Sequence, residues 1–257
     1  MSIPEYVPGH GLLEGLTVIV TAAAGTGIGQ ATARRCQEEG AAVVLSDAHE
    51  RRLREAADSL GGSGPRPLAV PCDVTVEQDV QRLFDVALSE HGRVDVVVNN
   101  AGLGGTAELV DMTDEQWSKV LDVTLTGTFR CTRAALRAMR AQRSGVVVNN
   151  ASVLGWRAQP GQAHYAAAKA GVMALTRCAA MEAADFGVRV NAVAPSLAMH
   201  PHLARVTTEE LLGQLAAREA FGRPAEPWEV ANVIVFLASP YSSYMTGEVV
   251  SVSSQHP

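Results

Sequence analysis

Tyr165 and Lys169 stand four residues apart in a stretch, YAAAKAGVMAL over 165–175, whose composition favours a helix. On a helix, positions i and i+4 share one face, so the phenol and the ammonium can meet. A nearby ammonium stabilises phenolate and lowers the pKa of the phenol, which suits the pair to proton transfer. Lys119 and Lys169 are the only lysines, so chance gives this spacing with a probability of roughly 3%. An exposed helix start with an ordinary surface lysine is the alternative.

A glycine-bearing turn follows the first apolar run of the chain. Residues 16–21, LTVIVT, form a β-branched run of strand length, and a helical stretch over 30–39 follows the turn. In that order, backbone N–H groups and the helix N-terminus can bind a pyrophosphate. The residues of this turn predicted to bind a dinucleotide are Gly25, Thr26, Gly27, Ile28 and Gly29.

Asp47 follows the second predicted strand, 41–46, and lies about 20 residues beyond Gly27. At that place a carboxylate accepts hydrogen bonds from both ribose hydroxyls of a dinucleotide and repels a 2′-phosphate. Ala48 and His49 come next rather than an arginine, so the sequence predicts NAD in preference to NADP. An ordinary turn aspartate is the alternative.

Polar residues also close the third and fourth predicted strands, 67–71 and 94–99. In a doubly wound sheet the carboxyl ends of the strands form the edge where ligands bind, so these residues are predicted to contact adenine or to brace the cofactor. Asx caps and turns are the alternative. The residues assigned to cofactor binding on this ground are Asp73, Val74, Asn100, Ala101 and Gly102.

Strand and helix patterns alternate along the whole chain, which predicts the α/β class. We expect a single Rossmann-type, doubly wound domain with an about seven-stranded parallel sheet and helices on both faces. Residues 1–15 read as an N-terminal lead-in, 16–257 as one domain, and 197–226 as a substrate lid, since long loops in such folds carry function. The predicted strands are 16–21, 41–46, 67–71, 94–99, 145–151, 188–192 and 248–252. The predicted helices are 30–39, 50–60, 76–90, 113–140 (one long helix or a helix pair), 165–185, 208–220 and 227–238.

The composition of the 257 residues, 47% hydrophobic and 19% charged with a net charge of −6, describes a globular protein without a basic surface for nucleic acid. The sequence has no run of about 18 apolar residues, so no membrane partner is expected. No leader-like segment opens the chain, which favours the cytoplasm. The four cysteines are scattered without metal-ligand spacing, so neither a metal site nor a disulfide framework is predicted: Cys36, Cys72, Cys131 and Cys178.

Together these motifs resemble the short-chain dehydrogenase/reductase family over nearly the full length. The resemblance implies reversible hydride transfer between a nicotinamide cofactor and an alcohol or carbonyl, commonly in a homotetramer. It also implies that Tyr165 is the acid/base, that Ser152 hydrogen-bonds the substrate oxygen, and that Lys169 lowers the pKa of Tyr165. Tyr165 and Lys169 are expected to touch the cofactor as well, with Lys169 on the nicotinamide ribose. The motifs are Gly25-x-Gly27-x-Gly29, Asp73-Val74, Asn99-Asn100-Ala101-Gly102, Ser152, Tyr165-x-x-x-Lys169 and Asn191-x-x-x-Pro195, and Pro195 is counted among the cofactor residues.

The chain departs from the family pattern at four places. The glycine turn has an extra residue and an alanine where the first glycine is expected, which leaves the path of the loop open. Thr124 replaces an asparagine that helps to hold a proton-relay water, and a hydroxyl there could still hold water. Ser196 and His200 replace a glycine and a threonine after Pro195, so the nicotinamide amide is expected to be held differently. The end SVSSQHP, 251–257, replaces an Asp-Gly-Gly ending and could line a neighbouring subunit.

Several of these departures resemble a subgroup of bacterial reductases of steroid catabolism, which implies a bulky alicyclic substrate, with a coenzyme A thioester as one option. Similarity to 3-oxoacyl-carrier-protein reductases, with linear substrates, is the alternative, and a non-catalytic dinucleotide-binding regulator is the rival from another class. Trp156 and Arg157 could rim the substrate cleft, where the arginine would grip a carboxylate or phosphate, or Arg157 could simply stack on Trp156. His200 and His202 are either substrate contacts or solvated loop residues.

Overall fold

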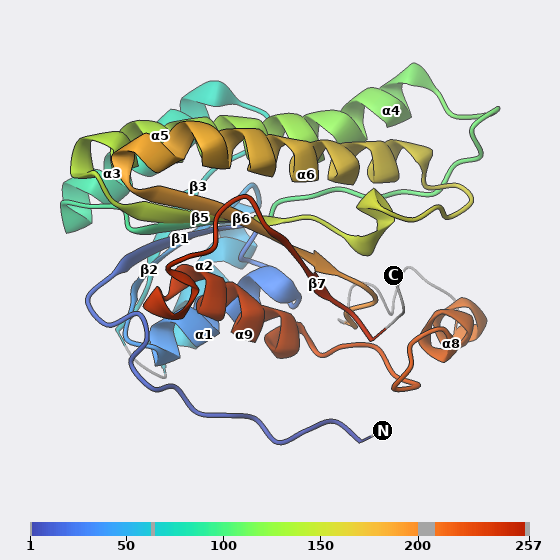
Figure 1. Ribbon diagram of the computed structural model, residues 1–257, viewed down its shortest axis with the longest axis horizontal. Coiled ribbons are helices and arrows are strands. Elements are labelled where there is room, and N and C mark those ends of the chain that lie inside the picture. The colour runs from blue at the N-terminus through green and yellow to red at the C-terminus, as the bar shows by residue number, and fades with distance from the viewer. Residues whose placement is uncertain (1, 63–64, 200–208, 255–257) are drawn as a thin grey trace.

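The computed structural model describes residues 2–62, 65–199 and 209–254, and these form one parallel sheet with helices on both faces (Figure 1). The seven strands lie in the order β3-β2-β1-β4-β5-β6-β7, which confirms the predicted fold class and strand number. The strands are β1 (Thr17–Thr21), β2 (Ala42–Asp47), β3 (Leu68–Pro71), β4 (Val96–Asn99), β5 (Gly145–Asn150), β6 (Val188–Pro195) and β7 (Val249–Val252).

Helices cover the two faces of the sheet in separate layers (Figure 1). In β1, Val18 and Val20 face the layer that contains α1 and α9, whereas Ile19 faces the layer that contains α3, α5 and α6. Both faces of the strand are buried, which is why parallel strands read as continuous apolar runs. The helices are α1 (Ile28–Glu38), α2 (Glu50–Gly61), α3 (Glu77–His91), α4 (Asp114–Leu121), α5 (Gly127–Gln142), α6 (Ala163–Ala183), α8 (Glu209–Ala217) and α9 (Pro227–Ala238).

The long helical prediction over 113–140 corresponds to two helices joined by a π-helical turn, η1 (Asp122–Thr126). Thr113 caps α4 with a capping box, because its side chain accepts from Gln116 N–H while the Gln116 side chain accepts from Thr113 N–H. A π-helical turn changes the direction in which side chains leave the helix, and such turns are frequent at functional sites.

The N-terminal lead-in lies along α1 and is fixed there by hydrogen bonds. The buried carboxylate of Glu39 accepts from His10 N–H at 2.8 Å and Leu12 N–H at 3.0 Å. The Arg35 guanidinium donates to the Val7 carbonyl at 3.0 Å and to Glu39 at 2.8 Å. The segment that the sequence describes only as a loop is therefore an ordered strap along α1.

Candidate active site

The strand order reverses beside β1, since β1 pairs with β2 on one side and with β4 on the other. At such a switch point the loops diverge and leave a crevice outside the carboxyl ends of the strands. A cleft of about 790 Å³ lies there. Its lining comes from the glycine turn, the loop after β4, the end of β5, the start of α6 and the segment after β6.

The glycine turn places an anion-binding helix end in this cleft. Gly27 is the N-cap of α1 and provides no side-chain cap, and no acidic residue lies in the first turn, so the first N–H groups stay available to an anion. A Cβ at Gly29 would lie 2.4 Å from the Ala22 carbonyl oxygen and 2.5 Å from Asn100 Nδ2. Only glycine allows this close approach of helix and strand, and the cradle fits the pyrophosphate of a dinucleotide.

The alanine that stands in place of the expected glycine adopts a left-handed conformation. Ala22 has φ = 51°, a conformation that costs roughly 1–2 kcal/mol for a residue with a Cβ. Its carbonyl accepts from Asn100 Nδ2 at 3.2 Å, and the next N–H, of Ala23, donates to the Ser46 carbonyl at 3.0 Å. The sequence left the path of this loop open. The structure shows that the chain turns at Ala22 in a left-handed conformation, which hydrogen bonds to Asn100 and Ser46 hold in place.

Asp47 ends β2 and contacts the glycine turn. One carboxylate oxygen accepts from Ala24 N–H at 3.3 Å and the other from His49 N–H at 2.9 Å. Burial raises the pKa of Asp47, while the Ala24 hydrogen bond and the nearby Arg52 oppose the rise. Asp47 is not part of the cleft lining itself.

Ser152 and Tyr165 both line the cleft, and the Ser152 hydroxyl lies near enough to the phenol to influence its pKa. Ser152 follows β5 and begins the 3-10 turn η2 (Val153–Gly155), where its Oγ also accepts from Leu154 N–H at 3.2 Å. Burial raises the pKa of Tyr165, and the nearby Ser152 hydroxyl partly offsets the rise. The phenol is therefore neutral at neutral pH and able to donate its proton.

Lys169 lies one helical turn beyond Tyr165 with its Nζ 5.5 Å from the centroid of the tyrosine ring. The side chain is 3% exposed, and burial lowers its pKa to about 8. Nζ donates to the Asn150 carbonyl at 2.5 Å. Burial is the largest influence on both groups, and it raises the pKa of the phenol. That Lys169 lowers the pKa of Tyr165 stays a prediction.

Thr124 is fully buried in η1, and its hydroxyl makes two hydrogen bonds with the backbone of Leu103. It donates to the Leu103 carbonyl at 3.0 Å and accepts from Leu103 N–H at 2.9 Å. The hydroxyl proton is thus directed to the backbone of the loop after β4. Thr124 fastens this loop, and Leu103, not Thr124, lines the cleft.

The other predicted cofactor residues divide into those that line the cleft and those that support it. Asp73 forms an Asx turn, with one oxygen accepting from Thr75 N–H at 2.9 Å and Thr75 Oγ1 at 2.7 Å. Val74 packs against α5, where a Cβ at Gly127 would lie 2.6 Å from its methyl group. Predicted residues in the cleft lining are Gly27, Ile28, Gly29, Asn100, Gly102, Ser152, Tyr165, Lys169 and Pro195, and those outside it are Gly25, Thr26, Asp47, Asp73, Val74, Ala101 and Thr124.

Several lining residues were missed from the sequence. The loop after β4 contributes residues 103–106, and Gln162 Nε2 fastens it by donating to the Gly105 carbonyl at 2.7 Å. No motif marks a loop of this kind. Asn150 could have been found, because an Asn-Asn pair closes β5 as another closes β4.

The expected rim of the substrate cleft is only partly described. Trp156 is 51% exposed, and neither it nor Arg157 belongs to the described lining of the cleft. His200 and His202 lie outside the described residues. From the predicted lid, Leu197, Ala198 and Leu215 face the cleft.

The described residues contain neither a candidate metal site nor a candidate membrane-spanning helix. Residues 2–62, 65–199 and 209–254 contain no group of three or more histidine, cysteine or acidic side chains placed to hold a metal ion. In the same ranges, no helix combines the length and the apolar character that crossing a membrane requires.

A glycine turn at the switch point of a parallel sheet, with a partly buried tyrosine and a buried serine and lysine beside it, defines a dinucleotide-dependent oxidoreductase of the Rossmann type. A protein-family model described as "Enoyl-(Acyl carrier protein) reductase" matches residues 22–254. The chain belongs to the short-chain dehydrogenase/reductase family, whose members use a nicotinamide dinucleotide.

Individual relatives agree over the whole length. A "(5R,7aS)-5-hydroxy-7a-methyl-1-oxo-2,3,5,6,7,7a-hexahydro-1H-indene-carboxyl-CoA reductase" of Mycobacterium tuberculosis is 64% identical over 256 residues, 99% of this chain and 98% of the relative. A 3-oxoacyl-[acyl-carrier-protein] reductase of Thermotoga maritima is 38% identical, covering 93% and 97%. The crystal structure of a short chain dehydrogenase from Mycobacterium smegmatis superposes with a TM-score of 0.89 at 59% identity, covering 100% and 99%.

Proposed function

We propose that this oxidoreductase interconverts a secondary alcohol and a ketone on a bulky alicyclic ring that carries a coenzyme A thioester. The single observation that carries the chemistry is that Ser152, Tyr165 and Lys169 line the same cleft as the glycine turn. The 64% identity to a hexahydroindene-carboxyl-CoA reductase over 99% of this chain supports the substrate class. The lower identity, 38%, to a 3-oxoacyl-carrier-protein reductase makes a linear substrate the weaker hypothesis.

The side chains divide the work of proton transfer. The nicotinamide supplies the hydride to the carbonyl carbon. Tyr165 donates its phenolic proton to the carbonyl oxygen, which Ser152 also hydrogen-bonds, so the negative charge that develops there is neutralised. Lys169, held by the Asn150 carbonyl, is placed to donate a further hydrogen bond to a hydroxyl of the nicotinamide ribose and to present its ammonium to the phenolate left after transfer.

NAD is the proposed cofactor, with NADP less favoured. The Asp47 carboxylate ends β2 and touches the glycine turn at Ala24, where a 2′-phosphate would be repelled. Arg52 is the cation that acts on Asp47 electrostatically. We expect Asp47→Ser to reduce the preference for NAD, so that the dissociation constant for NADP divided by that for NAD becomes smaller. Equal affinity of the unaltered enzyme for NAD and NADP would refute this use of Asp47.

The segment 197–226 is proposed as the substrate lid, because Leu197, Ala198 and Leu215 present apolar side chains to the cleft. A bulky ring would be enclosed by such side chains. A cytoplasmic location is proposed, since the four cysteines are free and three of them are buried, which is typical of a reducing compartment.

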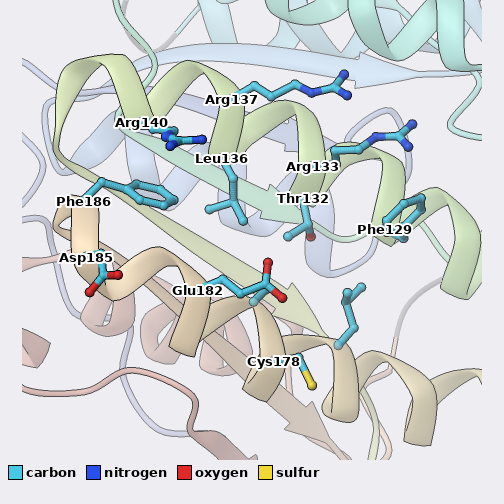
Figure 2. A pocket seen from close by; sticks show the side chains of 12 residues that line it. Phe129, Thr132, Arg133, Leu136, Arg137, Arg140, Cys178, Glu182, Asp185 and Phe186 are labelled. Carbon is cyan, nitrogen blue, oxygen red and sulfur yellow. The ribbon is translucent and has the colours of Figure 1, made fainter.

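A homotetramer is proposed, with the groove between α5 and α6 as one face that a second copy covers. Phe129, which is 40% exposed, lines this groove together with Leu136 and Leu175, so the groove offers apolar side chains to a second copy. Arg137 and Arg140 line the α5 side, and Glu182 lies on the α6 side (Figure 2). A twofold axis along the groove would set the arginines of one copy against the carboxylates of the other.

A turnover panel tests the proposed function. The enzyme is incubated with NADH or NADPH and either a bicyclic ketone carrying a coenzyme A thioester or a linear 3-oxoacyl thioester, and absorbance of the reduced nicotinamide is followed. We expect kcat/KM to be at least tenfold higher for the bicyclic thioester with NADH. Faster turnover of the linear substrate would establish the carrier-protein-reductase alternative, and binding without turnover across the panel would establish a non-catalytic regulator.

A further inference from the structure

Two asparagine pairs close β4 and β5, and they point to opposite faces of the sheet because side chains alternate along a strand. Asn99 Nδ2 donates to Asn149 Oδ1 at 2.8 Å, and Asn149 Nδ2 donates to Thr176 on α6 at 2.9 Å. Asn100 and Asn150 form the second pair, which lines the cleft. The same chemistry thus occurs twice, once in the core and once in the active site.

The orientation of the second pair is fixed by its neighbours. Asn100 Nδ2 donates to the carbonyls of Thr21 and Ala22, each at 3.2 Å, so Asn100 Oδ1 must be an acceptor. Asn150 Nδ2 donates to that oxygen at 2.9 Å. The NH₂ group of Asn150 therefore points toward Asn100. Asn100 in turn donates to the carbonyl of Ala22, the residue in the left-handed conformation.

Asn150 has a second connection through its main chain. Its carbonyl accepts from Lys169 Nζ at 2.5 Å, and the residue is 9% exposed. Its Oδ1 is buried and has no hydrogen-bond partner within the described parts of the chain. The single bond to Asn100 consequently orients the whole side chain, and the residue links the glycine turn to Lys169.

We propose that Asn150 is a positioning residue that couples the dinucleotide-binding turn to Lys169, by holding Asn100 with its side chain and Lys169 with its main chain. A dinucleotide that extends from the glycine turn to Lys169 then binds to groups that are already in position, which lowers the entropy cost of binding. The inference concerns cofactor binding, so it holds for whichever ketone the enzyme reduces.

The test measures dinucleotide affinity without substrate, so its result does not depend on the proposed function. Asn150→Leu keeps the approximate volume and removes the donor to Asn100. We expect the dissociation constant for NADH, followed by its fluorescence, to rise about tenfold, in line with one hydrogen bond lost at a buried acceptor. Should this variant fail to fold, Asn150→Asp keeps the shape, loses the donor, and is expected to weaken binding as well.

Asn149→Leu is the matched control, because it removes a buried amide from the same strand, one residue away, on the face without the cleft. It should lower the melting temperature and leave NADH affinity unchanged. A double-mutant cycle with Asn100→Ala should be non-additive, since both changes break the same bond. Unchanged NADH affinity in Asn150→Leu, an equal loss in Asn149→Leu, or additivity in the cycle would overturn the proposal.

Discussion

The two ends of helix α6 face two concavities that differ in kind. Its first turns carry Tyr165 and Lys169 into the cleft of about 790 Å³ at the strand ends. Its last turns carry Cys178 and Glu182 into a groove of about 560 Å³ against α5, shown in Figure 2. Each concavity has room for a ligand, yet only one of them concentrates polar groups from many elements.

The cleft receives loops, strand ends and a helix start, so short polar side chains from distant parts of the sequence converge there. Burial then shifts the pKa of Tyr165 upward and that of Lys169 down to about 8. The groove is lined by α5, by the last turns of α6 and by the short turn η3 (Ala184–Phe186) that follows it, so its charges stay apart along helix surfaces. The difference teaches that the strand ends make the reactive site, and that α5 and α6 offer a surface for packing.

The largest effect is expected from Tyr165→Phe, which removes the proton donor but keeps the ring in the cleft. Turnover should fall by about three orders of magnitude, within the range for loss of a general acid. NADH affinity and the mass of the assembly by light scattering should stay unchanged, because neither depends on the hydroxyl. Turnover at the rate of the unaltered enzyme would remove Tyr165 from the mechanism.

A charge placed in the groove should give the opposite pattern. Phe129→Asp puts a carboxylate on a side chain that is 40% exposed and lines the groove. We expect the assembly to dissociate, seen as a smaller mass in light scattering, while NADH binding is retained. Phe236→Asp is the matched control, with a phenylalanine that is 38% exposed on α9 and outside the groove. Equal masses of the two variants would show that the groove is not an interface.

The sequence predicted the architecture well because the fold leaves a strong pattern. Strands buried on both faces become continuous apolar runs, and their ends carry the site residues. The errors are local, as in β6, which continues beyond the expected 192 to Pro195 since it pairs there with Val252 of β7. The turn around Ala22 could not be traced from spacing, because the left-handed conformation depends on bonds to distant strands.

Side-chain environments were harder to predict than positions. The spacing of Tyr165 and Lys169 shows that they share a helix face, but it does not show how deeply each is buried. Burial decided the pKa of both, and Lys169 turned to the Asn150 carbonyl. The role of Thr124 in a proton relay stays a prediction, and the structure shows that its hydroxyl hydrogen-bonds the backbone of Leu103.

A smaller effect is expected in the pH dependence of stability, and it would sharpen the contrast between the two ends of α6. The folded pKa of Lys169 is about 8, below its ordinary 10.5, so between these values the unfolded chain binds more protons. The contribution of Lys169 to the unfolding free energy must therefore rise with pH across this window. Urea denaturation at pH 8 and pH 10 should show this rise as a difference between the enzyme and Lys169→Met.

Buried thiols act in the opposite direction, since burial raises the pKa of Cys36 to about 12 and that of Cys72 to about 11. The enzyme and Lys169→Met contain the same two thiols, so the effect of the thiols cancels when the unfolding free energies of the two proteins are subtracted. The control is Arg177→Met, on the same helix, which should leave the pH dependence unaltered. A pH-independent difference between the enzyme and Lys169→Met would show that the ammonium is not desolvated.

The smallest effect concerns backbone strain, at one residue beside the cleft and one residue at the end of α5. Ala22 at the cleft has φ = 51° and Arg143, at the end of α5, has φ = 55°. Glycine adopts this conformation freely, so either residue replaced by glycine should gain about 0.5–1 kcal/mol of unfolding free energy after the added entropy of the unfolded chain is subtracted. Urea denaturation measures the gain.

Only the change at the cleft should also alter function. Ala22→Gly loosens the turn that Asn100 braces, so NADH affinity should fall, although by less than in Asn150→Leu because the hydrogen bonds remain. Arg143→Gly should stabilise the fold with no change in affinity, since α5 ends far along the helix layer from the cleft lining. If both variants gained stability and neither lost affinity, the strain at Ala22 would be a property of the turn alone, with no part in preparing the site for its dinucleotide.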